Sequence, residues 1–90
     1  EEAERLGMIY NYFSAESFEE ETWKIAAHLA KMPTKALALT KEALNQSLTN
    51  NLEEQLALES KNQIEAASTA DYKEGVNAFI EKRKPNFKGE

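Results

Sequence analysis

The sequence contains no cysteine, one histidine, two prolines and three glycines in 90 residues. The absence of cysteine excludes disulfides, thiolate nucleophiles and cysteine-based zinc sites. The lone imidazole of His28 cannot form a histidine-rich metal site within one chain, so we expect no metal site. No apolar run approaches the ~20 residues that a membrane span needs. We therefore expect no insertion into a membrane.

The first residues, Glu1-Glu2-Ala3-Glu4, lack the basic start and the apolar stretch of a secretory signal peptide. The chain also lacks an initiator methionine and begins inside a helix-like pattern. We therefore expect a segment of a longer protein, and we expect that protein to be cytoplasmic.

Charge is distributed unevenly along the chain. The net charge of -5 divides into -8 for residues 1–81 (7 Lys and Arg against 15 Asp and Glu) and +3 for residues 82–90 (4 against 1). The acidic body argues against nucleic-acid binding, because lysine and arginine supply that affinity by neutralising phosphates. The basic end has two interpretations, an ordinary charged tail or a place for one small anion.

The residue types that dominate the chain are good helix formers: Ala, Leu, Glu, Lys and Gln. Apolar residues recur at steps of three and four in four stretches, which predicts four main helices after a short helical leader. Their expected limits are Ser14 or Ser17 to Pro33, Thr34 to about Leu48, Asn51 to about Ser68, and Thr69 to Pro85. Short connections imply antiparallel neighbours. The predicted fold is all-α, a small bundle of about four helices.

The expected helix starts are marked by capping residues. Ser17, followed by acidic residues, matches a capping box, and Thr34, Asn51 and Thr69 precede the other three helices. The segment 8–13, Met-Ile-Tyr-Asn-Tyr-Phe, is strand-like but has no partner strand in this chain. We expect this segment to be extended or poorly ordered, its partner strands lying outside the chain.

The acidic groups do not predict catalysis. Residues 19–21 and 53–54 are glutamates in first helical turns, where negative charge supports the helix. No glycine-rich phosphate loop, serine elbow or metal motif is present. Trp23 has two interpretations, a packing residue or part of an exposed patch. We assign no catalytic residue to this chain.

The C-terminal stretch is the most informative one. On a continuing helix Phe79, Lys82 and Arg83 share a face, because residues three and four apart are neighbours. An aromatic ring beside cationic side chains can stack on a base and pair with a phosphate, which predicts a site for one end of a nucleotide. Complementing the dipole at a helix C-terminus is the simpler alternative.

The same stretch closely resembles the C-terminal signature of the enoyl-CoA hydratase/isomerase (crotonase) family. The matching positions are Asp71, Glu74, Gly75, Ala78, Phe79, Lys82, Arg83, Pro85 and Phe87. Residues 2–9 resemble a helix-then-strand segment of the family, and residues 26–45 resemble two of its helices. The stretch from Leu52 to Gln63, with Tyr72, is most similar to the epoxyphenylacetyl-CoA isomerase group.

The resemblance implies an enzyme whose chemistry lies outside this chain. Family members bind acyl-CoA thioesters in an N-terminal α/β spiral domain, where two backbone N–H groups hold the enolate. The substrate is a coenzyme A thioester, and no tightly bound cofactor is implied. Positions matching Phe79 and Lys82 contribute to the coenzyme A end of the site, with Lys82 near phosphate. The position matching Gln63 is often aromatic in hydratases, and this chain departs from the pattern there.

The resemblance also implies a division of the chain and a set of partners. Residues 1–13 would be a remnant of the α/β domain, and residues 14–90 a helical C-terminal domain. That domain would contact its own N-terminal domain, cover the acyl-CoA site and self-associate as a trimer or a dimer of trimers. We expect the parent protein to be a lyase or isomerase and this segment alone to be inactive. The alternative is a free-standing helical module whose apolar face docks a partner helix.

Overall fold

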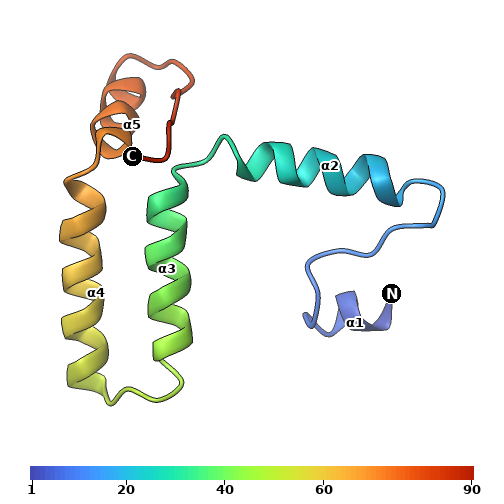
Figure 1. Ribbon diagram of the computed structural model, residues 1–90, viewed down its shortest axis with the longest axis horizontal. Coiled ribbons are helices and arrows are strands. Elements are labelled where there is room, and N and C mark those ends of the chain that lie inside the picture. Colours follow the sequence, from blue (N-terminus) through green and yellow to red (C-terminus); the bar gives the residue numbers. More distant parts are fainter.

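The computed structural model describes all 90 residues and contains five α-helices and no strand (Figure 1). Their bounds are α1 (Glu2–Arg5), α2 (Phe18–Leu29), α3 (Thr34–Gln46), α4 (Leu52–Ala67) and α5 (Ala70–Ile80). The predicted all-α class is confirmed, and α2 to α5 correspond to the four expected main helices. No helix is both long enough and apolar enough to cross a membrane.

Helices α3 and α4 form an antiparallel hairpin, the best-packed part of the molecule (Figure 1). Two side chains of α4 donate hydrogen bonds to carbonyl oxygens of α3. Asn62 Nδ2 donates to the Leu39 carbonyl at 3.1 Å, and Gln55 Nε2 donates to the Ala43 carbonyl at 3.2 Å. Asn62 is buried, so its hydrogen bond compensates the cost of removing its amide from water. These bonds fix one register of α4 against α3.

Two of the four expected caps are confirmed. Asn51 and Glu54 form a complete capping box at the start of α4: the Asn51 side chain accepts from the Glu54 amide at 2.9 Å, and the Glu54 carboxylate accepts from the Asn51 amide at 3.0 Å. Thr69 Oγ1 accepts from the Tyr72 amide at 3.1 Å at the start of α5. Each cap satisfies an amide that has no partner within its helix.

The other two expected caps are wrong. Ser17 stands at the N-cap of α2 but makes no capping bond, because its hydroxyl turns back to the Ser14 carbonyl (3.5 Å) and hydroxyl (3.2 Å). Thr34 is already the first helical residue of α3, and Pro33 takes the N-cap position. A proline has no side chain that could cap, so α3 begins without a side-chain cap.

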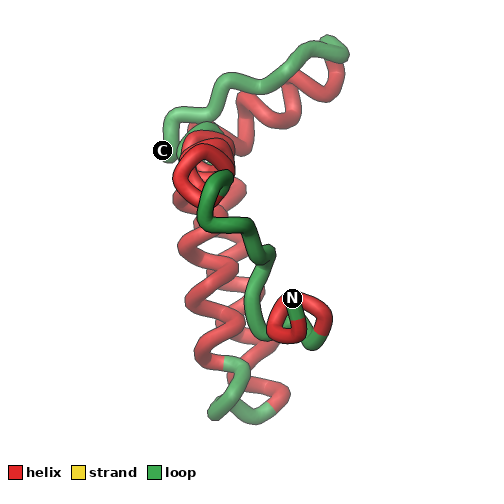
Figure 2. Tube along the Cα trace, turned by 90° about the vertical axis from the view of Figure 1, so that its right-hand side faces the viewer, coloured by secondary structure: helices red, strands yellow, loops and turns green.

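The N-terminal third lies away from the hairpin. Helix α2 extends sideways from the top of α3, and α1 lies beyond it at the end of a long loop (Figure 1). Figure 2 looks along this direction, so that α2 points toward the viewer and α1 lies in front of the hairpin. The strand-like segment 8–13 forms neither strand nor helix. It has no neighbouring strand to supply backbone partners.

The molecule has almost no core. Ala78 is the only apolar residue that is buried, at 1% exposure. The Cα radius of gyration is 16.6 Å, whereas a compact chain of this length has about 12 Å. The accessible surface is 7466 Å², against about 5300 Å² for a compact monomer of this mass. The helices therefore form a hairpin with attached arms instead of a closed bundle.

Candidate functional site

The C-terminal end of α5 differs from the expected helix. The helix ends at Ile80, five residues before Pro85, so the prediction that it continues to the proline is wrong. Lys82 takes a left-handed conformation with φ 54°. Its amide donates to the Phe79 carbonyl at 3.3 Å, and the Arg83 amide donates to the Ala78 carbonyl at 3.0 Å. This bonding is a Schellman motif, which terminates the helix.

The predicted common face of Phe79, Lys82 and Arg83 is therefore wrong as a helical arrangement. Only Phe79 lies on α5, and the other two follow the turn that ends it. Arg83 Nη1 and Nη2 bind the Glu74 carboxylate at 2.6 and 2.9 Å, and Arg83 Nε binds Glu81 at 2.5 Å. Lys82 has no ion-pair partner in the structure, so its ammonium is available for an anion.

The Arg83 guanidinium changes the acid–base behaviour of Glu74. Its hydrogen bonds to the carboxylate, followed by one from the Asn86 amide, lower the pKa of Glu74 from 4.5 to about 2. The same pairing raises the pKa of Arg83. Arg83 is thus committed to contacts within the chain, and the expected cationic pair at the nucleotide-end site reduces to Lys82.

An apolar hollow of about 380 Å³ lies beside Phe79, whose side chain is 86% exposed. The hollow is bounded by the start of α3, by α5 and by the C-terminal tail. Its apolar lining residues are Pro33, Ala36, Ala66, Val76, Phe79 and Phe87, with Tyr72 beside them. Such a surface can take an apolar or aromatic group. Asp71 also lines it, but both of its carboxylate oxygens accept hydrogen bonds from the Lys88 and Gly89 amides.

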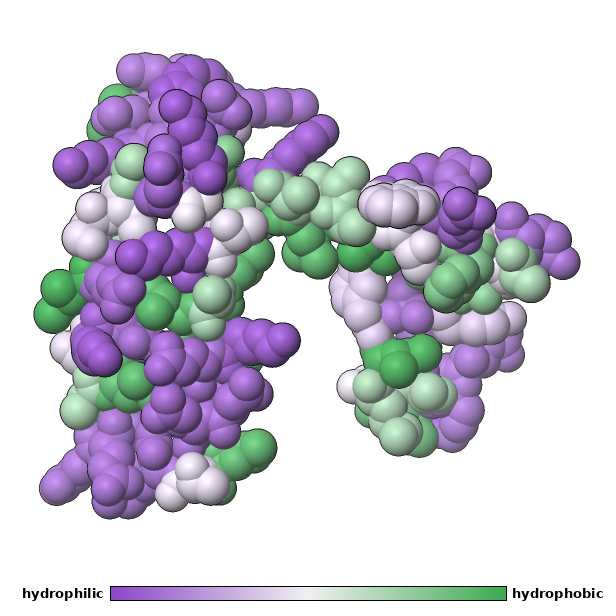
Figure 3. Space-filling view, viewed as in Figure 1, coloured by the Kyte–Doolittle hydropathy of each residue, from purple (hydrophilic) through white to green (hydrophobic).

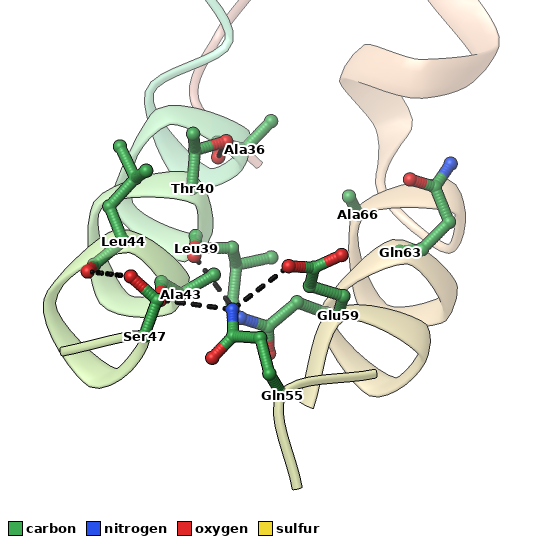
Figure 4. Close-up of a pocket in the computed structure, with 11 residues that line it drawn as sticks. Ala36, Leu39, Thr40, Ala43, Leu44, Ser47, Gln55, Glu59, Gln63 and Ala66 are labelled. Atoms are coloured by element: carbon green, nitrogen blue, oxygen red, sulfur yellow. Dashed lines mark hydrogen bonds between the residues drawn. The ribbon is translucent and has the colours of Figure 1, made fainter. Parts of the chain in front are cut away.

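A larger groove of about 650 Å³ runs between α3 and α4 (Figure 4). Glu59 is its only carboxylate, and it accepts a hydrogen bond from Gln55 Nε2 at 2.9 Å. Gln63, the position noted for its departure from the family pattern, also lines this groove. With one carboxylate and no histidine or nucleophile beside it, the groove lacks the partners of an acid–base site.

The remaining candidates, Lys24, His28 and Trp23, are exposed. Lys24 pairs with Glu20 and Glu21 at 2.7 Å each on the surface of α2. His28 is exposed and lines a shallow hollow with Tyr10. No group of three or more histidine, aspartate or glutamate side chains could hold a metal ion. Trp23 is 68% exposed, which decides between its two interpretations in favour of an exposed patch.

Comparison with known proteins identifies the kind of protein to which these helices belong. The sequence model of the enoyl-CoA hydratase/isomerase family matches residues 1–90. The chain belongs to this family. It is 46% identical over 89 residues to a probable enoyl-CoA hydratase of Rhodobacter capsulatus. It is 44% identical over 89 residues to the 1,2-epoxyphenylacetyl-CoA isomerase of Escherichia coli K12.

These family members are much longer than the present chain. Each alignment covers 99% of this chain but 35% of the first relative and 34% of the second. A crystal structure of an enoyl-CoA hydratase subunit from Geobacillus kaustophilus matches with a TM-score of 0.89 and 43% identity, over 99% of this chain and 35% of that one. The open arrangement of α1 to α5 therefore corresponds to part of a larger enoyl-CoA hydratase/isomerase fold.

The sequence did not predict the contacts that several residues of the family signature make. Asp71, Glu74, Gly75 and Phe87 were recognised from the signature, but their contacts are made across 12 to 18 residues with the tail. No helical or strand periodicity signals such contacts, because the tail that makes them has no regular structure. Only the fold brings these residues together.

Proposed function

We propose that this chain is the C-terminal oligomerisation domain and coenzyme A pocket lid of an acyl-CoA hydratase/isomerase. In this proposal residues 1–13 continue into an N-terminal α/β spiral domain, and residues 14–90 form the helical domain. The whole protein would convert an acyl-CoA thioester by hydration or isomerisation through an enolate. The chain would contribute shape and contacts, and the other domain the oxyanion donors and carboxylates.

The observation that carries this proposal is the exposed apolar surface. Large apolar side chains lie exposed on α2, α3, α4 and α5, while a single alanine is buried. Figure 3 shows apolar residues on the surface of the hairpin and of the N-terminal third. Monomeric proteins rarely expose contiguous apolar surface on this scale, so such surface marks contacts with other parts of a protein or with other subunits. The excess of about 2000 Å² over a compact monomer is of the size that stable protein interfaces bury.

Phe79 and Lys82 are the residues that we propose for the coenzyme A end of the site. Phe79 offers an exposed ring next to an apolar hollow. Lys82, three residues later and without an ion-pair partner, offers a charge for a phosphate. A base stacks on an aromatic ring through its π-face, and lysine binds phosphate as a point charge.

The test compares the isolated chain with the chain joined to the preceding part of its reading frame. Purified proteins are assayed for hydration of a short-chain enoyl-CoA and for isomerisation of an epoxyphenylacetyl-CoA. We expect no turnover by the isolated chain and turnover of one substrate by the longer protein. Turnover by the 90 residues alone would contradict the proposed division of roles. A monomeric longer protein without acyl-CoA activity would favour the free-standing interaction module.

The residue assignment is tested in the longer protein by Phe79→Ala and Lys82→Ala, with Lys84→Ala as the matched control. We expect Michaelis constants for acyl-CoA that rise about tenfold for Lys82→Ala, equivalent to about 1.4 kcal/mol, with little change in kcat. An equal effect of Lys84→Ala would show general electrostatic attraction and would contradict a specific role for Lys82.

A further inference from the structure

The last five residues of the chain fold back along α5 (Figures 1 and 2). We call residues 86–90 the tail strap. Asp71, in the first turn of α5, binds the far end of this strap. Its Oδ1 accepts from the Lys88 amide and its Oδ2 from the Gly89 amide, both at 2.7 Å, while the Asp71 amide donates to the Glu90 carbonyl at 2.9 Å. Three short hydrogen bonds thus hold the strap at the start of α5.

Glu74 binds the near end of the strap, one helical turn after Asp71. Its Oε1 accepts from the Asn86 amide at 2.8 Å, and both carboxylate oxygens bind the Arg83 guanidinium. The chain is thereby turned back directly after the Schellman motif. Two carboxylates on one face of α5 therefore hold both ends of the strap.

The strap lies close to two helices, at Gly75 of α5 and at the start of α3. A Cβ added at Gly75 would lie 3.4 Å from the Phe87 ring, an ordinary contact distance, so this ring packs directly on α5. Gly89 has φ +82°, and a Cβ there would lie 2.5 Å from Thr34 Oγ1. Thr34 is the first residue of α3. The strap therefore reaches from α5 to the hairpin helix that packs mainly against α4.

We propose that Asp71 and Glu74 are positioning residues that fasten α5 to α3 through the tail strap and so set the place of Phe79. This inference rests on the proposed function for the part that concerns coenzyme A. Helix α5 has far fewer contacts with α4 than α3 has, and the strap supplies a second attachment, to α3. Neither carboxylate takes part in the reaction itself.

Burial makes Asp71 the decisive residue. It is 4% exposed, and a buried carboxylate is costly unless hydrogen bonds satisfy both oxygens. Asparagine at this position has one acceptor oxygen and one amide nitrogen, which would face an N–H donor of Lys88 or Gly89. Asp71→Asn therefore keeps the shape of the side chain and breaks the strap.

The experiment measures amide hydrogen exchange and acyl-CoA kinetics of the longer protein with Asp71→Asn. Glu53→Gln is the matched control, because Glu53 also lies in the first turn of a helix but has no side-chain partner. We expect protection at Lys88 and Gly89 to fall about tenfold, as for the loss of a charge-assisted hydrogen bond. Protection around Phe79 falls with it, the Michaelis constant for acyl-CoA rises and kcat stays unchanged. Glu53→Gln changes none of these.

Gly89→Ala tests the α3 contact without altering a carboxylate. Alanine is strained at φ +82°, and its methyl group also forces the strap away from Thr34, so we expect the same loss of protection around Phe79. Adding Thr34→Ala makes room for the methyl group, so the double variant regains part of that protection.

The outcomes separate this proposal from the proposed function. Loss of protection at the strap alone, with α5 protection and the Michaelis constant unchanged, would overturn the positioning role. An unmodified longer protein that converts no acyl-CoA would contradict the proposed function alone. The exchange pattern at α5 would then still decide whether the strap positions this helix.

Discussion

Lys82 occupies a backbone conformation that glycine adopts more readily. The left-handed region brings the Cβ of an ordinary residue close to the following carbonyl, at a cost of roughly 1 kcal/mol, and Lys82 lies there with φ 54°. Strained residues of this kind persist where the surrounding structure determines them, and they cluster at functional sites. The proposed phosphate contact explains why a lysine, and not a glycine, occupies this position.

Replacing this lysine is expected to separate stability from binding. Lys82→Gly removes the strain, so we predict that the last turn of α5 becomes more stable by roughly 0.5–1 kcal/mol, seen as slower amide exchange at Ile80. The same variant in the longer protein loses affinity for acyl-CoA, because the ammonium is gone. Lys84→Gly is the control and brings no gain in stability. Faster exchange at Ile80 in Lys82→Gly would contradict the interpretation.

Glu74 makes the stability of the fold fall at low pH. Hydrogen bonds from Arg83, then from the Asn86 amide, lower its pKa in the folded chain to about 2, below the ordinary 4.5. Its contribution to stability is therefore fully present above about pH 4.5 and is lost as the pH falls toward 2.

Thermal melts between pH 7 and pH 2 test this titration. We predict that the difference in melting temperature between the unmodified longer protein and its Glu74→Gln variant is largest at neutral pH and has largely disappeared at pH 2. Other carboxylates titrate equally in both proteins and cancel in the difference. A difference that stays constant with pH would show that the Arg83 pairing does not stabilise the fold.

At the scale of the helices, local sequence explains some boundaries and neighbouring residues override others. The Asn51 cap could be predicted because all its partners lie within three residues. The Ser17 cap could not, because Ser14 competes for the same hydroxyl. Pro33 takes the N-cap of α3 with ψ 82°, and Thr34 is already helical. The end of α5 was set by a Schellman turn that uses a lysine where glycine is usual.

Ser17 and Asn51 form a matched pair for a capping experiment. Asn51→Ala removes a formed capping box, so we predict a loss of about 1 kcal/mol and faster exchange of the Glu54 amide. Ser17→Ala removes a hydroxyl that caps nothing and leaves the exchange of α2 amides unchanged. If the two substitutions changed the amide exchange of their helices equally, the structural assignment of the caps would be contradicted.

For the whole molecule, the amount of exposed apolar surface decides how the chain behaves alone. Hydrogen bonds of Asn62 and Gln55 bridge the hairpin, while leucines such as Leu48 and Leu52 are exposed. Burial of apolar surface contributes roughly 25 cal/mol per Å², so surface that finds no cover in the monomer favours association.

We therefore predict that the isolated chain self-associates or is partly molten. In sedimentation it should exceed the mass of a monomer, and it should bind a hydrophobic dye. The double variant Leu48→Ser, Leu52→Ser should shift it toward the monomer, whereas Asn45→Ser, an exposed polar control on α3, should not. A monomer that melts sharply and binds no dye would contradict the interpretation of this surface as an interface.

The sequence by itself determined the helical class, the approximate extents of α2 to α5, two caps and the resemblance to the enoyl-CoA hydratase/isomerase family. These follow from residue types and spacings that act within a few positions along the chain. The tertiary structure alone decided that the helices form an open hairpin with arms, that Arg83 binds Glu74, and that Asp71 holds the tail. Those contacts depend on where a chain without regular structure returns in space, and on which apolar faces find a partner.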